Sequence, residues 1–237
     1  MGHQKYHENK KGIKNDSEYT RRDFIKLTRN VAIGSLVVGS IPGMACINNT
    51  MLIIPASGGY LLVDTKKCQG CYSCMLACSL VHEGKENLSL ARIQVIQDPF
   101  EGFPDDLTIE QCRQCTEPKC VEVCPAGALH VDTENKNIRR VDQDKCIGCM
   151  SCVEACPHLP SRAIWNFNKV HAQICDLCLD TPYWDEKGGP EGKQCCVEVC
   201  PVGAVKFTKK IPEQEGVKGY KVNLRGPAWR IMGYPTD

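Results

Sequence analysis

The residues with the clearest chemical role in this 237-residue chain are its cysteines. Sixteen of the 18 cysteines fall into four groups of four, whose members are mostly separated by two or three other residues. In chain order the groups are Cys68, Cys71, Cys74 and Cys78; Cys112, Cys115, Cys120 and Cys124; Cys146, Cys149, Cys152 and Cys156; and Cys175, Cys178, Cys196 and Cys200. Three groups end in Cys-Pro. This spacing is typical of the ligands of cubane iron–sulfur clusters.

A cubane cluster needs four soft thiolate ligands. Three cysteines separated by two residues let one tight loop wrap three corners, with backbone N–H groups turned toward the negative sulfides. The fourth cysteine lies on the next helical turn, which the following proline ends because it lacks an N–H and has a fixed φ. In two-cluster ferredoxins this fourth cysteine binds the other cluster. Sixteen such cysteines therefore predict four [4Fe–4S] clusters and a function in electron transfer.

Two other uses of many cysteines fit the sequence less well. A disulfide framework is common in exported chains, but cysteines at two-residue spacing are poorly placed to pair with one another. Disulfides also give no reason for the repeated Cys-Pro. Structural zinc uses two Cys-x2-Cys pairs and would leave the third and fourth cysteines of each group without a role. We therefore favour iron–sulfur ligation.

One cysteine lies directly beside a member of the fourth group. Cys195 precedes Cys196, but only Cys196 has the three-residue spacing to Cys200. The segment 196–201 also repeats the segment 120–125 letter for letter. We therefore predict that Cys196 is the ligand and that Cys195 is a spare thiol beside the cluster.

Composition and charge limit the function classes. Aromatic residues make up 6% of the chain, so we expect the clusters to serve as much of the core and folding to be coupled to their insertion. The net charge is +1, but without residues 1–45 the chain has 21 basic and 24 acidic residues. Each oxidised cluster adds roughly −2 more. An acidic surface of this kind excludes nucleic-acid binding, which needs a basic face.

The N-terminus has the features of an export signal. Arg21 and Arg22 are adjacent, follow a polar lysine-rich stretch and are followed by Phe24, a pattern typical of the twin-arginine route. The apolar run Val31–Ala45 comes next but is short and broken by glycines, so we do not expect it to span a membrane. The chain is therefore expected in the periplasm or on the outer face of the cytoplasmic membrane.

The signal segment could be processed in two ways. Gly43 and Ala45 fit the small-residue rule for cleavage after Ala45. Lipidation of Cys46 is the alternative, but a branched apolar residue is expected where Gly43 stands. We favour cleavage, or retention as an uncleaved tail, over lipidation.

Internal duplication indicates how the rest of the chain is organised. The segment 63–71 matches 141–149, and Pro125–Ala128 resembles Pro201–Ala204. Each repeat unit has the pattern of a strand, a cluster loop, a short helix ended by proline and a second strand.

The repeats predict an α+β fold. Leu129–Asp132 and Ile138–Val141 are expected to be strands joined by the polar turn 133–137. The predicted fold contains two ferredoxin-like modules of small sheets and short helices, each with two cubane clusters. The predicted regions are a twin-arginine segment at 1–45, a linker at 46–60, the cluster region at 61–210 and a tail at 211–237.

Three stretches are insertions or extensions on this scaffold. Residues 79–111 contain the alternating strand Arg92–Ile96 and a turn-rich loop, and residues 179–195 form a polar, glycine-rich loop. The tail ends in Trp229, Ile231, Met232 and Tyr234. All three stretches could be solvated surface. For the tail, the alternative is a contact with a larger partner, because aromatic side chains exposed to water are unfavourable.

From Leu61 to about Thr208 the chain resembles the four-cluster iron–sulfur subunits of the dimethyl sulfoxide reductase family of molybdenum and tungsten enzymes. The four cysteine groups in order carry this resemblance. The segments 77–84 and 90–93 look closer to the partners of tungsten aldehyde oxidoreductases.

The resemblance implies a ligand set for each cluster, in which groups one and four exchange ligands, as do groups two and three. The implied sets are Cys68, Cys71, Cys74 and Cys200; Cys175, Cys178, Cys196 and Cys78; Cys112, Cys115, Cys120 and Cys156; and Cys146, Cys149, Cys152 and Cys124.

The resemblance also implies that the chain is an electron-transfer subunit without a catalytic site of its own. Its expected partner is a large molybdopterin- or tungstopterin-containing catalytic subunit, and a quinone-reactive membrane subunit is a further candidate. A free-standing periplasmic polyferredoxin is the alternative function. His158 follows Cys156-Pro157 and is either solvated or placed to tune a cluster.

Overall fold

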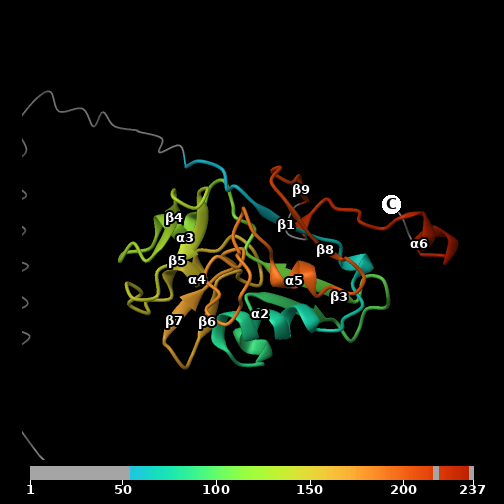
Figure 1. Cartoon of the computed structure of the whole chain (residues 1–237), viewed down its shortest axis with the longest axis horizontal. Helices are drawn as coiled ribbons and strands as arrows, with labels where there is room; N and C mark the ends of the chain where they lie inside the picture. Colours follow the sequence, from blue (N-terminus) through green and yellow to red (C-terminus); the bar gives the residue numbers. More distant parts are fainter. Residues whose placement is uncertain (1–53, 216–218, 235–237) are drawn as a thin grey trace, which may run out of the picture. The chain divides into compact units, whose positions relative to one another are not determined.

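A computed structural model describes residues 54–215 and 219–234 (Figure 1). They belong to a unit that spans Ile53–Asp237. The predicted twin-arginine segment, its cleavage site and Cys46 lie outside the described residues. In the part that is described, no helix has the length and apolar character needed to cross a membrane.

Small sheets and short helices make up the described part, which confirms the predicted mixture of elements. Its five sheets are two-stranded and antiparallel. The paired strands are β1 (Tyr60–Val63) with β8 (Val205–Thr208), β2 (Ile93–Gln97) with β3 (Leu107–Gln111), β4 (Leu129–Asp132) with β5 (Ile138–Val141), β6 (Ile164–Asn166) with β7 (His171–Gln173), and β9 (Gln214–Glu215) with β10 (Gly219–Tyr220). The helices are η1 (Thr65–Lys67), α2 (Ser73–Glu83), η2 (Leu88–Leu90), α3 (Lys119–Glu122), α4 (Ser151–Glu154), α5 (Cys195–Glu198) and α6 (Pro227–Ile231).

The first and last strands of the cluster region pair with each other. Tyr60 in β1 lies opposite Thr208 in β8, and Val63 lies opposite Val205. Figure 1 shows these two strands side by side although they come from distant parts of the sequence. The pairing brings the first cysteine group next to the fourth.

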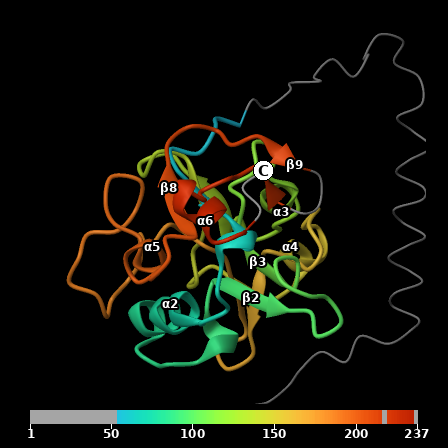
Figure 2. The ribbon, with the colours of Figure 1, turned by 90° about the vertical axis from the view of Figure 1, so that its right-hand side faces the viewer.

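One hydrophobic core contains cysteines of groups one and four. It lies among the β1–β8 pair, α2, α5 and the β2–β3 hairpin, and Figures 1 and 2 show α2 beside β2. Ile93 and Leu177 are each 1% exposed in this core, but many of its other members are cysteines. The α2 helix ends at Gly84, whose φ of 65° is a left-handed conformation that suits glycine.

A second, smaller core contains cysteines of groups two and three. Its buried members are Leu129, Cys152, Ala163, Ala172 and Ile174. Further cysteines of the two groups pack against it at partial exposure. Because most of these side chains are small, the thiols make up much of this interior.

Strand predictions held where a local pattern was present. β4 and β5 have the predicted bounds, and the strand expected at 92–96 begins and ends one residue later. The turn between β4 and β5 places Lys136 and Asn137 at a φ of 59°. Neither β3 nor the β6–β7 hairpin was predicted from the sequence, although the apolar and polar residues of β3 alternate from Leu107 to Glu110.

The loop 179–195 packs closely at its middle. Gly188 is buried, and a Cβ there would collide with the carbonyl oxygen of Cys178. Gln194 Nε2 donates a hydrogen bond to the carbonyl oxygen of Gly189 at 2.9 Å. This loop therefore lies directly against the fourth cysteine group.

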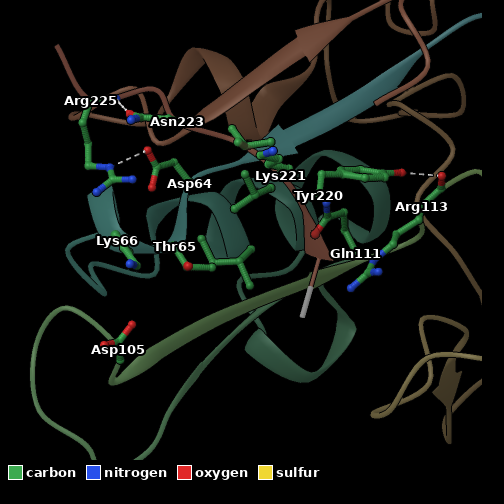
Figure 3. A pocket seen from close by; sticks show the side chains of 13 residues that line it. Asp64, Thr65, Lys66, Asp105, Gln111, Arg113, Tyr220, Lys221, Asn223 and Arg225 are labelled. Carbon is green, nitrogen blue, oxygen red and sulfur yellow. Dashed lines mark hydrogen bonds and ion pairs between the residues drawn. The ribbon is translucent and has the colours of Figure 1, made fainter. Parts of the chain in front are cut away.

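Buried polar contacts at Tyr220 and at Leu224 and Arg225 attach the C-terminal tail to the rest of the unit (Figure 3). Tyr220 is 8% exposed, and its hydroxyl donates to the carbonyl oxygen of Arg113 at 2.5 Å. Asp64 accepts hydrogen bonds from the backbone N–H of Leu224 at 2.8 Å and from Arg225 Nε at 3.1 Å. The side chains of Asp64 and Arg225 are 2% and 3% exposed, so this ion pair is shielded from water.

Beyond these attachments the tail exposes apolar side chains. Tyr234 packs on Phe103 and on Trp229, with both ring centroids 5.1 Å from its own. Ile231 and Met232 are 86% and 59% exposed.

We predict that Asp64→Ala releases the tail. The substitution leaves the buried Arg225 without this carboxylate, and removal of one partner of a buried pair typically costs about 3–5 kcal/mol. In anaerobically purified protein, limited proteolysis should cleave residues 221–234 faster than in wild type, and the Tm should fall. Asp142→Ala, which removes an exposed pair with Lys145, is the control. Equal effects of both substitutions would contradict the anchoring role.

Candidate functional site

The cysteines of the four groups line four separate cavities. The sets are Cys68, Cys71, Cys74 and Cys200 in cavity I; Cys78, Cys175, Cys178 and Cys196 in cavity II; Cys112, Cys115, Cys120 and Cys156 in cavity III; and Cys124, Cys146, Cys149 and Cys152 in cavity IV. Each cavity thus combines three cysteines of one group with the fourth cysteine, or its equivalent, of another. Each cavity contains the four cysteines that the family resemblance implies as one ligand set, and cavity II is lined by Cys195 as a fifth.

Short helices distribute the thiols between neighbouring cavities. α2 carries Cys74 to cavity I and, one turn later, Cys78 to cavity II. α5 carries Cys196 to cavity II and is followed by Cys200, which lines cavity I. α3 and α4 do the same for cavities III and IV. Because each helix serves two cavities, the cavities of a pair are held at a fixed separation.

The loops around the cavities share one backbone feature. The second residue after the first cysteine of every group has a positive φ, at Gly70 (63°), Gln114 (49°), Gly148 (73°) and Leu177 (58°). Left-handed residues within a turn point successive N–H groups toward one side and form a site for a negative group. Two of these residues are not glycine, and this conformation costs them on the order of 1–3 kcal/mol each.

Backbone N–H groups also bond to the sulfur atoms. The fourth cysteine of every group accepts one such bond, from Arg92 to Cys78 (3.3 Å), from Leu129 to Cys124 (3.3 Å), from Arg162 to Cys156 (3.3 Å) and from Ala204 to Cys200 (3.2 Å). Hydrogen bonds of this kind favour the thiolate over the thiol, and metal binding requires the thiolate.

The thiols would repel one another once ionised. Burial and neighbouring thiols together raise the pKa of Cys74 and Cys120 to about 12, and that of Cys152 to about 11. All 17 cysteines of the described part are free, so disulfides do not offset this cost. Iron cations would offset it, and four thiolates are the donor set of a [4Fe–4S] cluster. The cavities therefore fit such clusters.

Cavity II is bordered by a buried charge network. Asp176 accepts hydrogen bonds from Arg92 Nη1 at 2.6 Å and from His82 Nε2 at 3.2 Å. Burial alone would lower the pKa of His82, but its bonds to Asp176 and Cys78 raise it to about 10. Arg92 and His82 line the cavity, so basic side chains face the five cysteines of cavity II.

The spare thiol is also found at cavity II. Cys195 and Cys196 both line this cavity, and each is 3% exposed. Cys195 Sγ is 3.6 Å from Cys178 Sγ, and the Cys195 backbone N–H donates to the same sulfur at 3.4 Å. The assignment of Cys196 as the ligand stays a prediction that rests on the spacing.

Cavity III is bordered by several basic side chains. Arg113, Arg139 and Arg162 line it together with His158. His158 Nε2 lies 3.5 Å from Cys115 Sγ, and burial and the charge of Arg113 lower its pKa. His158 is therefore not fully solvated, and it faces a cysteine as a neutral side chain at neutral pH.

A larger polar cavity, of about 570 Å³, lies among β1, β3 and the tail and contains no cysteine (Figure 3). Ile109 lines both this cavity and cavity I, and Arg113 lines both it and cavity III. The polar cavity therefore shares a lining residue with each of two cysteine cavities.

Sequence reasoning missed the charged residues that border the cavities. Asp176 stands between two ligand cysteines, and Arg139 stands inside a predicted strand. A charged residue in such a position is a signal of a buried ion pair or a ligand contact. Its partners, however, come from distant segments and are visible only in the structure.

The chain matches the family described as "4Fe-4S dicluster domain" over residues 105–210. This segment contains cysteine groups two, three and four.

The relatives that share at least 30% identity with the chain include the following three. The electron transport protein YsaA of Escherichia coli (strain K12) is 33% identical over 62% of this chain and 87% of its own length. The thiosulfate reductase electron transfer subunit PhsB of Salmonella typhi is 37% identical over 62% of this chain and 73% of its own. The aliphatic sulfonate oxidoreductase, polyferredoxin-like subunit of Pyrococcus furiosus is 38% identical over 60% and 70%.

Other relatives are longer. The chain spans 28% of the NADH-dependent phenylglyoxylate dehydrogenase subunit beta of Aromatoleum evansii, to which it is 35% identical over 60% of its own length. The family assignment rests on the relatives of which the chain covers two thirds or more of the length. The chain belongs to the family of iron–sulfur electron-transfer subunits with a 4Fe-4S dicluster domain, as its cysteine groups predicted.

Proposed function

We propose that the chain is the electron-transfer subunit of a periplasmic oxidoreductase complex and holds four [4Fe–4S] clusters, one in each of cavities I to IV. The observation that carries this proposal is the sorting of sixteen cysteines into four cavities with four ligand thiols each. A bound cluster of this type supplies one-electron redox chemistry. The protein supplies the ligands, their separation and the hydrogen bonds to sulfur.

The contacts between the cavities support a line in the order I, II, III, IV. Shared helices join I to II and III to IV. Gln114, which lies between two cysteines of cavity III, donates through Nε2 to the carbonyl oxygen of Cys175 of cavity II at 2.8 Å. Cys71 and Cys149 are the exposed cysteines, and they belong to cavities I and IV, the proposed ends of the line. Electrons would enter at one end and leave at the other.

The proposed partner is a large molybdopterin- or tungstopterin-containing catalytic subunit. The relatives named as subunits of thiosulfate reductase and of aliphatic sulfonate oxidoreductase support a place in such a complex. A quinone-reactive membrane subunit is proposed as a second partner. The exposed Ile231 and Met232 at the end of the tail support a protein contact there.

Export by the twin-arginine route completes the proposal. Arg21 and Arg22 would direct the chain to the periplasm or the outer face of the cytoplasmic membrane. Because this route carries folded proteins, it would suit a chain that receives its clusters before it leaves the cytoplasm.

We predict that Cys196→Ala loses the cluster of cavity II, whereas Cys195→Ala keeps it. The first variant leaves three ligand thiolates in the cavity, and the second removes only the spare thiol. Iron analysis of anaerobically purified protein should give about sixteen iron atoms per chain for Cys195→Ala and fewer for Cys196→Ala. If only Cys195→Ala lost iron, Cys195 would be the ligand and Cys196 the spare thiol.

We predict that the native complex, purified anaerobically from membranes and periplasm, contains about sixteen iron atoms per copy of this chain. Molybdenum or tungsten should co-elute with it on a large partner. Metal analysis of each fraction provides the measurement. A lone chain with the same iron content would instead support a free-standing polyferredoxin and would contradict a stable complex.

We predict that replacement of Arg21 and Arg22 together by lysine stops export. The protein should then accumulate in the cytoplasm, which cell fractionation and immunoblotting would detect. Lys10→Gln, which changes a basic residue outside the pair, should be exported like wild type. An unchanged periplasmic fraction in the double variant would disprove the proposed route.

A further inference from the structure

Three buried arginines have a guanidinium N–H without a partner among the described residues. The Nε–H groups of Arg92, Arg139 and Arg162 are shielded from water and donate to no acceptor among the described residues. The three residues are 6%, 1% and 5% exposed. A buried donor without an acceptor costs about 1–3 kcal/mol, so each of these N–H groups needs an acceptor.

All three arginines line a cavity of cysteines. Arg92 lines cavity II, whereas Arg139 and Arg162 line cavity III. Sulfide and thiolate sulfur atoms are acceptors for N–H donors. A cluster in each cavity would therefore supply what these three arginines lack.

Arg139 gives the strongest argument, because no carboxylate in the described part forms an ion pair with it. Its Nη1 and Nη2 donate to the carbonyl oxygens of Asn137 at 2.6 Å and Pro55 at 3.0 Å. A buried charge without a counter-ion is strongly unfavourable. Burial lowers the pKa of Arg139, and Tyr60 and the thiols of cavity III oppose this effect.

The other two arginines are held in place by carboxylates. Asp176 binds Arg92 through Nη1, and Glu110 forms an ion pair with Arg162 through Nη1. In both residues the Nε–H has no acceptor among the described residues. Arg92 lines cavity II, and Arg162 lines cavity III. The carboxylates thus act as positioning groups that fix the orientation of each guanidinium.

Cavities I and IV differ from this pattern. No charged side chain lines either of them, and their linings are apolar apart from the thiols, Gln69 and the ring of Tyr72. The four cavities therefore form two classes, a middle pair with fixed positive charge and an outer pair without it.

We propose that Arg92, Arg139 and Arg162 donate Nε–H···S hydrogen bonds to the clusters of cavities II and III and raise the reduction potentials of these two clusters. An added electron makes a cluster more negative, so a fixed positive charge and a charged donor beside it favour the reduced form. The inference rests on the proposed function, because it requires clusters in these cavities.

The test is a redox titration followed by EPR spectroscopy on anaerobically purified, full-length protein. In Arg92→Gln we expect one cluster to shift to lower potential. In Arg139→Gln and Arg162→Gln we expect a shift of a second cluster, the same one in both variants. Labelling with ¹⁵N-arginine should give a nitrogen coupling to reduced clusters in pulsed EPR, and each variant should weaken it.

Arg140→Gln is the matched control. Arg140 follows Arg139 in β5, but it pairs with Asp132 and lines no cysteine cavity. We expect the reduction potentials of all four clusters in Arg140→Gln to equal those of wild type. A second set of variants keeps the positive charge but loses the Nε–H: Arg92→Lys, Arg139→Lys and Arg162→Lys. We expect smaller shifts of the reduction potential in these variants. They replace any glutamine variant that does not load its clusters.

Two failures can be told apart. If wild type does not contain about sixteen iron atoms per chain, the proposed function fails. If all variants load their iron and every potential equals that of wild type, buried waters rather than clusters satisfy the three N–H groups, and the inference is overturned.

Discussion

The structure depends on the close approach of thiols that repel one another when ionised. Ionised thiols crowded into one small cavity are unfavourable without a cation, and the described residues form four cavities lined by at least four cysteines each. The left-handed loop residues, the N–H···S bonds and the one-turn helices all serve to bring sulfur atoms together at a fixed separation. The hydrophobic cores are arranged around these cavities, and cysteines are among their main members.

Local patterns in the sequence account for what could be predicted. The spacing of the cysteines is a local signal, and so is the alternation that gave β4, β5 and their polar turn. The resemblance to a family supplied the sorting of cysteines between cavities, which spacing alone does not determine. The charge network of Arg92, Asp176 and His82 joins segments far apart in the chain, and no local pattern contains that information.

Burial of charge is tied to the same cavities. In most small domains a buried guanidinium is matched by a carboxylate, as Asp64 matches Arg225 beneath the tail. Arg139 instead has two carbonyl oxygens and a set of thiols around it. The cysteine cavities and the buried carboxylates together surround the buried basic side chains of the described interior.

The pairing of β1 with β8 has a consequence for the order in which the chain can be completed. The parts of the second core lie between residues 112 and 174, so this core can close while the ribosome is still adding residues. The first core needs β8, which ends at Thr208. Among the four cysteine groups, group one is therefore translated first, but its core is completed only when β8 has been translated. During this interval its thiols are open to oxidation, so translation order favours a reducing compartment until the last strand is in place.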